Sequence, residues 1–298
     1  MKYILLLVTL LFGSLLSAAQ TVTVSILPQK YFVEQIAKDV LHVNVMVTPG
    51  SSPHTYEPKP SQMKQLSNSD AYFSIGDGFE KAWLPKFQST NPKMMMVDTI
   101  KGIEKIAMVE HHHDDEEKSD SKKEAHHDHD DHDHEAGELD PHVWLDPILV
   151  KTQAKNIYEA LVSLYPEHRD EFTRNYDAFI ASLDALDATL QSTLSEVKNR
   201  KFIVFHPSFG YFAKRYNLEQ IAIEVHGKEP KASELAHLIE EAKEENVKVV
   251  FVAPQFSQKS AQTIAKQIKG KTLTIDPLSD KWSENLLSIA KIFQSELK

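Results

Sequence analysis

The sequence has no cysteine, and only 9 of its 298 residues are glycine. Without cysteine, the chain has no disulfide bonds, thiolate metal ligands, cysteine nucleophiles or lipid-modified cysteine. Basic residues are also few, with 33 Lys and Arg against 43 Asp and Glu, and the net charge is −10. This balance provides no basic face for a nucleic acid, so we exclude nucleic acid as a partner.

Long apolar runs are absent except at the start of the chain. Residues 1–19 combine the basic Lys2, an apolar run from Tyr3 to Phe12, and small residues up to Ala19. This order is typical of a signal peptide, and the run is shorter than the roughly 20 residues needed to span a bilayer. We therefore expect cleavage near Ala19 and export of the mature protein into a periplasm.

After the signal peptide, short β-rich runs alternate with helical stretches. The expected strands are at residues 22–26, 42–48, 71–75, 202–205, 220–225, 247–252 and 272–275. The expected helices are at residues 31–39, 61–67, 209–215, 232–244, 257–268 and 282–297. Such alternation predicts an α/β protein of two lobes, each with a mainly parallel sheet flanked by helices.

A long helix is expected between the two lobes. Apolar residues recur every three or four positions from Phe172 to Val197, which places them in one stripe on a helix. A helix from Pro166 to Lys198 would be about 45–50 Å long, so we interpret it as a rigid linker. The expected order is signal peptide, N-terminal lobe, linker helix and C-terminal lobe, at residues 1–19, 20–165, 166–198 and 199–298.

Four side chains stand just after expected strands or in polar loops, each next to a proline: His54, His142, His206 and Asp276. Ligand sites in doubly wound sheets form at the carboxyl ends of the strands. Two of the four come from each lobe, so a cleft between the lobes could gather all of them. Three imidazoles and one carboxylate suit a tetrahedral divalent metal ion.

Other side chains nearby could replace members of this set. Asp140, Asp146 and Glu57 are competing carboxylates, and His226 competes with His206. No pair of candidates has the helical spacing of an H-E-x-x-H motif, so spacing alone leaves the ligand set open.

Five segments carry a resemblance to a known family: SSPHTYEPKPSQ (51–62), IGDGFEKAW (75–83), DPHVWLDP (140–147), VFHPSFGYFAKRY (204–216) and IDPLSD (275–280). On these segments, the chain resembles the metal-binding receptors of bacterial ABC uptake systems for zinc and manganese. The resemblance implies that His54, His142 and His206 are metal ligands, with Asp276 as the fourth; in some zinc receptors a water molecule or a loop group takes the fourth position instead. Histidine at the third position is similar to zinc receptors, whereas manganese receptors often carry Glu there, so Zn²⁺ is the implied ligand.

The resemblance also implies a set of partners and a role. The partners would be an ABC-type membrane permease with a cytoplasmic ATPase, and the role would be zinc capture for import, not catalysis. We expect a monomer. The alternatives are a manganese or iron receptor of the same family, a metal-dependent hydrolase, or an adhesin.

A low-complexity segment lies between the two halves of the N-terminal lobe. Residues 110–140 carry a net charge of −11, so the rest of the chain is nearly neutral. The segment holds eight of the 15 histidines: His111, His112, His113, His126, His127, His129, His132 and His134. We expect a disordered loop that collects metal ions weakly and near the cleft; the alternative is a plain acidic linker.

Common catalytic and cofactor motifs are missing. The run from Gly76 to Gly78 resembles the start of a dinucleotide-binding loop, but no third glycine follows at the required spacing. No G-x-S-x-G or P-loop motif is present. Four protein ligands would also close a zinc site, which favours binding over catalysis.

Overall fold

The computed structural model describes residues 20–108, 139–224 and 230–297. The signal peptide expected at residues 1–19, the His-rich segment 111–134 and His226 lie outside the described residues.

Within the described residues, the strands form two four-stranded sheets, and every pair of neighbouring strands is parallel. The first sheet has the order β2-β1-β3-β4 and the second β6-β5-β7-β8. The strands are β1 (Thr21–Val24), β2 (His42–Val45), β3 (Ala71–Ser74), β4 (Met95–Asp98), β5 (Lys201–Val204), β6 (Glu219–Ala222), β7 (Val249–Val252) and β8 (Lys271–Thr274). The two lobes therefore repeat one strand order, which confirms the predicted fold class.

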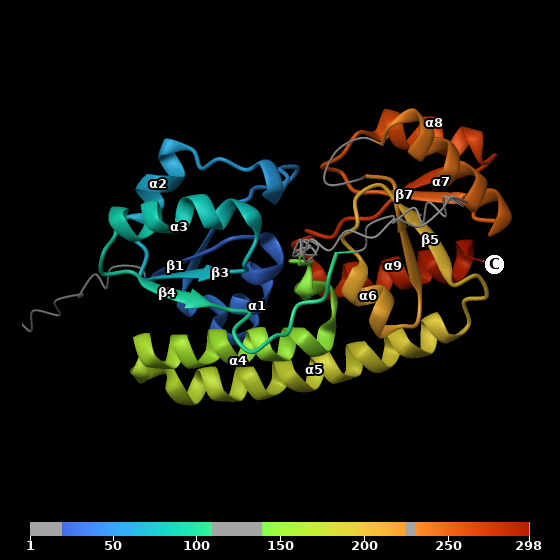
Figure 1. The fold of residues 1–298 in the computed structure, drawn as a ribbon. Helices are drawn as coiled ribbons and strands as arrows, with labels where there is room; N and C mark the ends of the chain where they lie inside the picture. The colour runs from blue at the N-terminus through green and yellow to red at the C-terminus, as the bar shows by residue number, and fades with distance from the viewer. Residues whose placement is uncertain (1–19, 109–138, 225–229, 298) are drawn as a thin grey trace, which may run out of the picture.

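Helices cover the sheets and connect the lobes (Figure 1). They are α1 (Leu27–Ala37), α2 (Pro60–Leu66), α3 (Gly78–Thr90), α4 (Pro147–Leu164), α5 (Arg169–Ser195), α6 (Gly210–Arg215), α7 (Ala232–Glu244), α8 (Gln258–Gln267) and α9 (Trp282–Glu296). Single 3₁₀ turns lie at Lys38–Val40, Pro53–Thr55, Val143–Leu145 and Pro166–His168. None of the described helices is long and apolar enough to cross a membrane.

The expected long helix is α5, which runs beneath both lobes in Figure 1. Its 27 residues correspond to about 40 Å. Pro166 opens a separate 3₁₀ turn just before it, so the helix starts three residues later than predicted. The helix packs on α4, on α1 of the first lobe and on α9 of the second. It therefore links the two lobes, as the sequence predicts, but it does so paired with α4.

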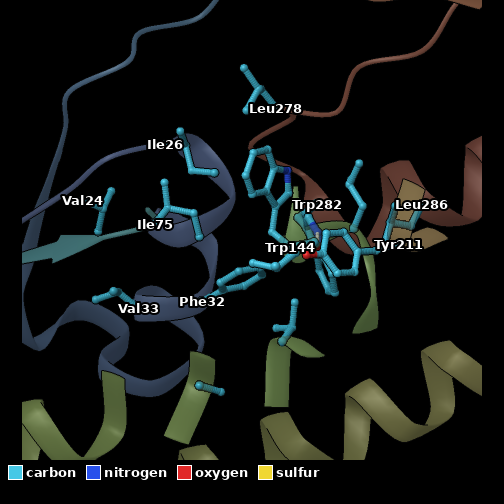
Figure 2. Packing of buried hydrophobic residues seen from close by; sticks show 14 of the residues in the cluster. Val24, Ile26, Phe32, Val33, Ile75, Trp144, Tyr211, Leu278, Trp282 and Leu286 are labelled. Carbon is cyan, nitrogen blue, oxygen red and sulfur yellow. Dashed lines mark hydrogen bonds between the residues drawn. The ribbon is translucent and has the colours of Figure 1, made fainter. Parts of the chain in front are cut away.

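An apolar core continues from one lobe to the other beneath the interlobe contact (Figure 2). Phe32 on α1 packs edge-on against Trp282 on α9, with 5.0 Å between the ring centroids. The indole N–H of Trp282 donates to the carbonyl of Trp144, and the indole N–H of Trp144 donates to the carbonyl of Pro277, both at 2.8 Å. These buried contacts fix the loop before α4 and the loop after β8 relative to each other.

Candidate metal centre

Three of the four expected ligands lie together between the lobes. His54 lies in the 3₁₀ turn after β2, His142 precedes the turn before α4, and His206 follows β5. Each of the three offers a ligand nitrogen within 4.8 Å of the other two. Asp276 is not a member of this cluster. Among the described residues, these three histidines are the one group of possible metal ligands that lie close enough together to hold an ion.

The imidazole nitrogens are already close to the spacing of a bound metal. Nε2 of His54 and Nε2 of His206 are 2.9 Å apart. Two nitrogens on one tetrahedral zinc would be roughly 3.3 Å apart, given bonds of about 2.0–2.1 Å. Moving the two rings apart by a few tenths of an ångström therefore makes room for an ion.

A buried carboxylate orients His142. Nδ1 of His142 donates to Oδ1 of Asp140 at 2.7 Å, and the backbone N–H of His142 donates to the same oxygen at 2.8 Å. Both side chains are almost fully buried, with exposed fractions of 5% and 1%. The bond fixes the proton on Nδ1, which leaves Nε2 with its lone pair for a metal.

A second carboxylate orients His206 in the same way. Nδ1 of His206 donates to Oε2 of Glu224 at 2.6 Å, just after β6. Burial lowers the pKa of His206, and this effect outweighs the opposite effect of Glu224. The ring therefore stays neutral to a lower pH than an ordinary histidine, as a metal ligand must.

His54 faces a third carboxylate at a longer distance. Its Nδ1 is 3.7 Å from Oδ2 of Asp77, and 30% of its side chain is exposed. Asp77 is buried, and its Oδ2 accepts no hydrogen bond from a described residue. Nδ1 therefore lies near a carboxylate in all three histidines, as a hydrogen bond in His142 and His206 and as a longer approach in His54.

The walls of the site are largely apolar. Phe256 stacks on His206, with ring centroids 4.7 Å apart and an interplanar angle of 19°. Trp144 lies 5.1 Å from His142, centroid to centroid. The cavity between them measures about 20 Å³, which fits an ion or one water molecule. Apolar walls strengthen the interaction of an ion with the few polar groups that reach it.

The remaining sequence candidates have other roles in the structure. Asp276 accepts hydrogen bonds from Gln255 and from the backbone of Leu278. Asp146 accepts a hydrogen bond from the backbone N–H of Ile148 at 2.7 Å and caps α4. Glu57 is exposed and outside the cluster.

The sequence interpretation missed the orienting role of the three carboxylates. The sequence predicted Asp140 only as a competing ligand and Asp77 only as part of a glycine-containing turn, and it assigned no role to Glu224. Asp77 follows β3 and Glu224 follows β6, whereas Asp140 lies just before the 3₁₀ turn that precedes α4. For Asp77 and Glu224, a position after the carboxyl end of a parallel strand was the available indication.

The fold and the histidine cluster define a two-lobed receptor with a candidate metal site between the lobes. The chain belongs to the family described as zinc-uptake complex component A, periplasmic, whose sequence profile matches residues 22–293. This confirms the family resemblance inferred from the five sequence segments.

Relatives of known name and structure agree with this assignment. The chain is 32% identical over 255 residues to the high-affinity zinc uptake system protein ZnuA of Bacillus subtilis, covering 84% of this chain and 76% of that protein. It is 30% identical to the zinc-binding lipoprotein AdcA of Streptococcus pneumoniae over 88% of this chain, and it spans only about half of AdcA (52%). A crystal structure of a zinc-bound ZnuA deletion mutant superposes with a TM-score of 0.83 at 42% identity, covering 94% of this chain and 99% of that one.

Proposed function

We propose that this chain captures Zn²⁺ between its lobes and delivers it to an ABC permease for import. The observation that carries the proposal is the convergence of His54, His142 and His206, each with one nitrogen within 4.8 Å of the others. Neutral imidazoles are typical zinc ligands, and carboxylates that bond their second nitrogens raise their basicity. The relatives are named as zinc-uptake or zinc-binding proteins, and the family consists of transport receptors, not enzymes.

Zinc is favoured over manganese by the chemistry of the donors. Manganese suits oxygen ligands, whereas the cluster offers three nitrogens and no carboxylate oxygen. Asp276 remains a candidate for the fourth position. To bind the ion, it would have to exchange its hydrogen bonds to Gln255 and Leu278 for a metal bond.

The partners and the location follow from the family. A component of a zinc-uptake complex requires a membrane permease and an ATPase to move the ion. We also propose export to a periplasm with cleavage near Ala19. The His-rich segment 111–134 would act as a weak auxiliary collector of zinc.

We propose the domain division stated for the sequence, with lobes at residues 20–165 and 199–298 and a linker at 166–198. The contacts of α5 with α1 and with α9 support this division. The continuous apolar core between the lobes favours small rather than large closing motions.

A thermal-shift panel tests the function. Zn²⁺, Mn²⁺, Cu²⁺ and Ni²⁺ are added to protein in which residues 111–134 are deleted. Zinc at about 100 times its Kd should stabilise the fold by about 2.7 kcal/mol. Stabilisation by Mn²⁺ but not by Zn²⁺ would overturn the zinc assignment.

Matched histidine variants locate the effect. His54→Ala, His142→Ala and His206→Ala should each reduce the zinc-induced shift. His168→Ala is the control. His168 lies in the turn just before α5, pairs with Glu171 in the first turn of α5, and is outside the cluster. A full shift in any of the three cluster variants would remove that histidine from the ligand set.

A further inference from the structure

The fourth position beside the three histidines is bordered by Gln255. This residue follows β7, and Asp276 follows the neighbouring strand β8. Gln255 lines the small histidine cavity and also a second cavity of about 240 Å³ beside it. Asp276 lines only the second cavity. Gln255 therefore stands between the histidine cluster and the carboxylate.

Asp276 determines how the amide of Gln255 is oriented. Nε2 of Gln255 donates to Oδ1 of Asp276 at 3.1 Å, and the backbone N–H of Leu278 donates to the same oxygen at 3.0 Å. A carboxylate only accepts hydrogen bonds, so the NH₂ end of the amide must face it. The carbonyl end, Oε1, is consequently not the end that faces Asp276, and the residue also lines the histidine cavity.

Oε1 of Gln255 is a buried acceptor in need of a donor. It is shielded from solvent, and none of the described residues donates a hydrogen bond to it. Buried carbonyls are nearly always satisfied by protein, water or a ligand. Three imidazoles leave one tetrahedral position on a zinc ion, and a water molecule in that position has two O–H donors.

We propose that Gln255 holds a zinc-bound water in the fourth position through Oε1, and that Asp276 acts by orienting Gln255 rather than by binding the ion. The inference rests on the proposed zinc site. Gln255 is then a positioning residue. Its neutral side-chain carbonyl accepts a hydrogen bond from the zinc-bound water without adding charge around the ion. Loss of such an outer partner typically weakens metal affinity 10–100-fold.

The test uses the full chain with four variants. Gln255→Leu and Gln255→Met, which has the same length, both remove the acceptor. Asp276→Asn keeps an oxygen that can accept from Gln255 but is a poorer metal ligand. Gln258→Leu is the control, because Gln258 lies in the same segment and donates to the backbone carbonyl of Ala253.

Two readouts are compared with the unmodified chain: Zn²⁺ affinity by chelator competition, and the visible spectrum with one equivalent of Co²⁺. We expect both Gln255 variants to bind Zn²⁺ at least tenfold more weakly and to change the Co²⁺ spectrum. Asp276→Asn and Gln258→Leu should retain the Co²⁺ spectrum. Thermal unfolding without metal shows whether each variant is folded.

Three results would overturn the proposal. The first is an unchanged affinity and spectrum in a folded Gln255→Met. The second is a spectral change in Asp276→Asn with a larger loss of affinity than in the Gln255 variants, which would make Asp276 the ligand. The third is a spectral change in Gln258→Leu equal to that in Gln255→Leu. None of these affects the proposed function, which fails if Mn²⁺ but not Zn²⁺ stabilises the fold, or if His142→Ala binds zinc as tightly as the unmodified chain.

Discussion

Replacement of Glu224 by glutamine is expected to weaken zinc binding about tenfold. Glu224 accepts from Nδ1 of His206 at 2.6 Å, and both side chains are more than nine-tenths buried. A charge-assisted hydrogen bond in such surroundings is stronger than a neutral one. Glutamine can still accept the Nδ1 proton but carries no charge. It should therefore cause the smaller part of the usual 10–100-fold loss, or about 1.4 kcal/mol.

Glu224→Ala removes the acceptor as well as the charge and should approach a 100-fold loss, or about 2.7 kcal/mol. The loss cannot come from protonation of His206. Glu224 raises the pKa of this histidine, so its removal lowers that pKa further and keeps the ring neutral. The pH at which the zinc affinity of each variant falls to half of that variant's own value at pH 7.5 should therefore not rise.

Chelator competition at pH 7.5 and in a series down to pH 5 measures both effects. The matched control is Glu219→Gln, at the start of β6, where the side chain is 60% exposed and pairs with Lys201. This control should bind zinc as the unmodified chain does. The reasoning is refuted if Glu224→Ala binds within twofold of the unmodified chain while His206→Ala loses binding.

Three further predictions concern the supports of the site. Gly210→Ala should weaken zinc binding about tenfold, since a Cβ there would be 2.5 Å from Oδ2 of Asp140. Gly78→Ala is the control, because a Cβ there would have no atom within 4 Å. Equal zinc affinities of the two variants would contradict the prediction. Asp187→Asn should lower the free energy of unfolding by about 1 kcal/mol at pH 7, because Arg215 holds the pKa of Asp187 below its usual 3.8. A carboxyl with a lowered pKa stabilises the fold above its unfolded pKa, and this effect is lost as the pH falls through the folded value. In urea unfolding, the difference in stability between Asp187→Asn and the unmodified chain should therefore shrink toward about pH 3.5. A difference that stays constant with pH would contradict the prediction. Phe32→Ala should lower the free energy of unfolding by about 3–5 kcal/mol. Because the core joins both lobes, calorimetry should still show one unfolding transition, at a lower temperature; two separate transitions would contradict this.

The repeated alternation of strands and helices was sufficient to predict the two parallel sheets. Strand and helix ends lie within four residues of the predictions, and α7 matches at both ends; the differences arise because caps rather than periodicity determine the ends. The helix expected at 31–39 begins at Leu27, for example, where Pro28 lies in the first turn. The linker helix was predicted with its correct stripe, although Pro166 belongs to a separate turn.

Three elements were not predicted from the sequence. The helix α3 starts at Gly78 and contains Pro85, both of which disfavour a helix assignment. The strand β4 is a half-buried edge strand with weak alternation. The helix α4 was missed despite a recognisable start, in which Asp146 caps the helix and Pro147 occupies its first position.

The histidines of the candidate site were identified from their places after expected strands or in polar loops, and the structure brings His54, His142 and His206 together. The carboxylates behind them could not be assigned, because the partner of an imidazole depends on side-chain directions that strand position alone does not define. Asp276 illustrates the same limit: it lies at the expected strand end but is turned toward Gln255.

X-ray absorption at the zinc edge tests the central claim most directly. Protein lacking residues 111–134 is loaded with one zinc per chain, which removes the His-rich segment as a competing site. We expect three imidazole nitrogens at about 2.0–2.1 Å and one oxygen donor, with one imidazole fewer in His142→Ala. Fewer than three imidazoles in the unmodified site, or an unchanged spectrum in His142→Ala, would contradict the account.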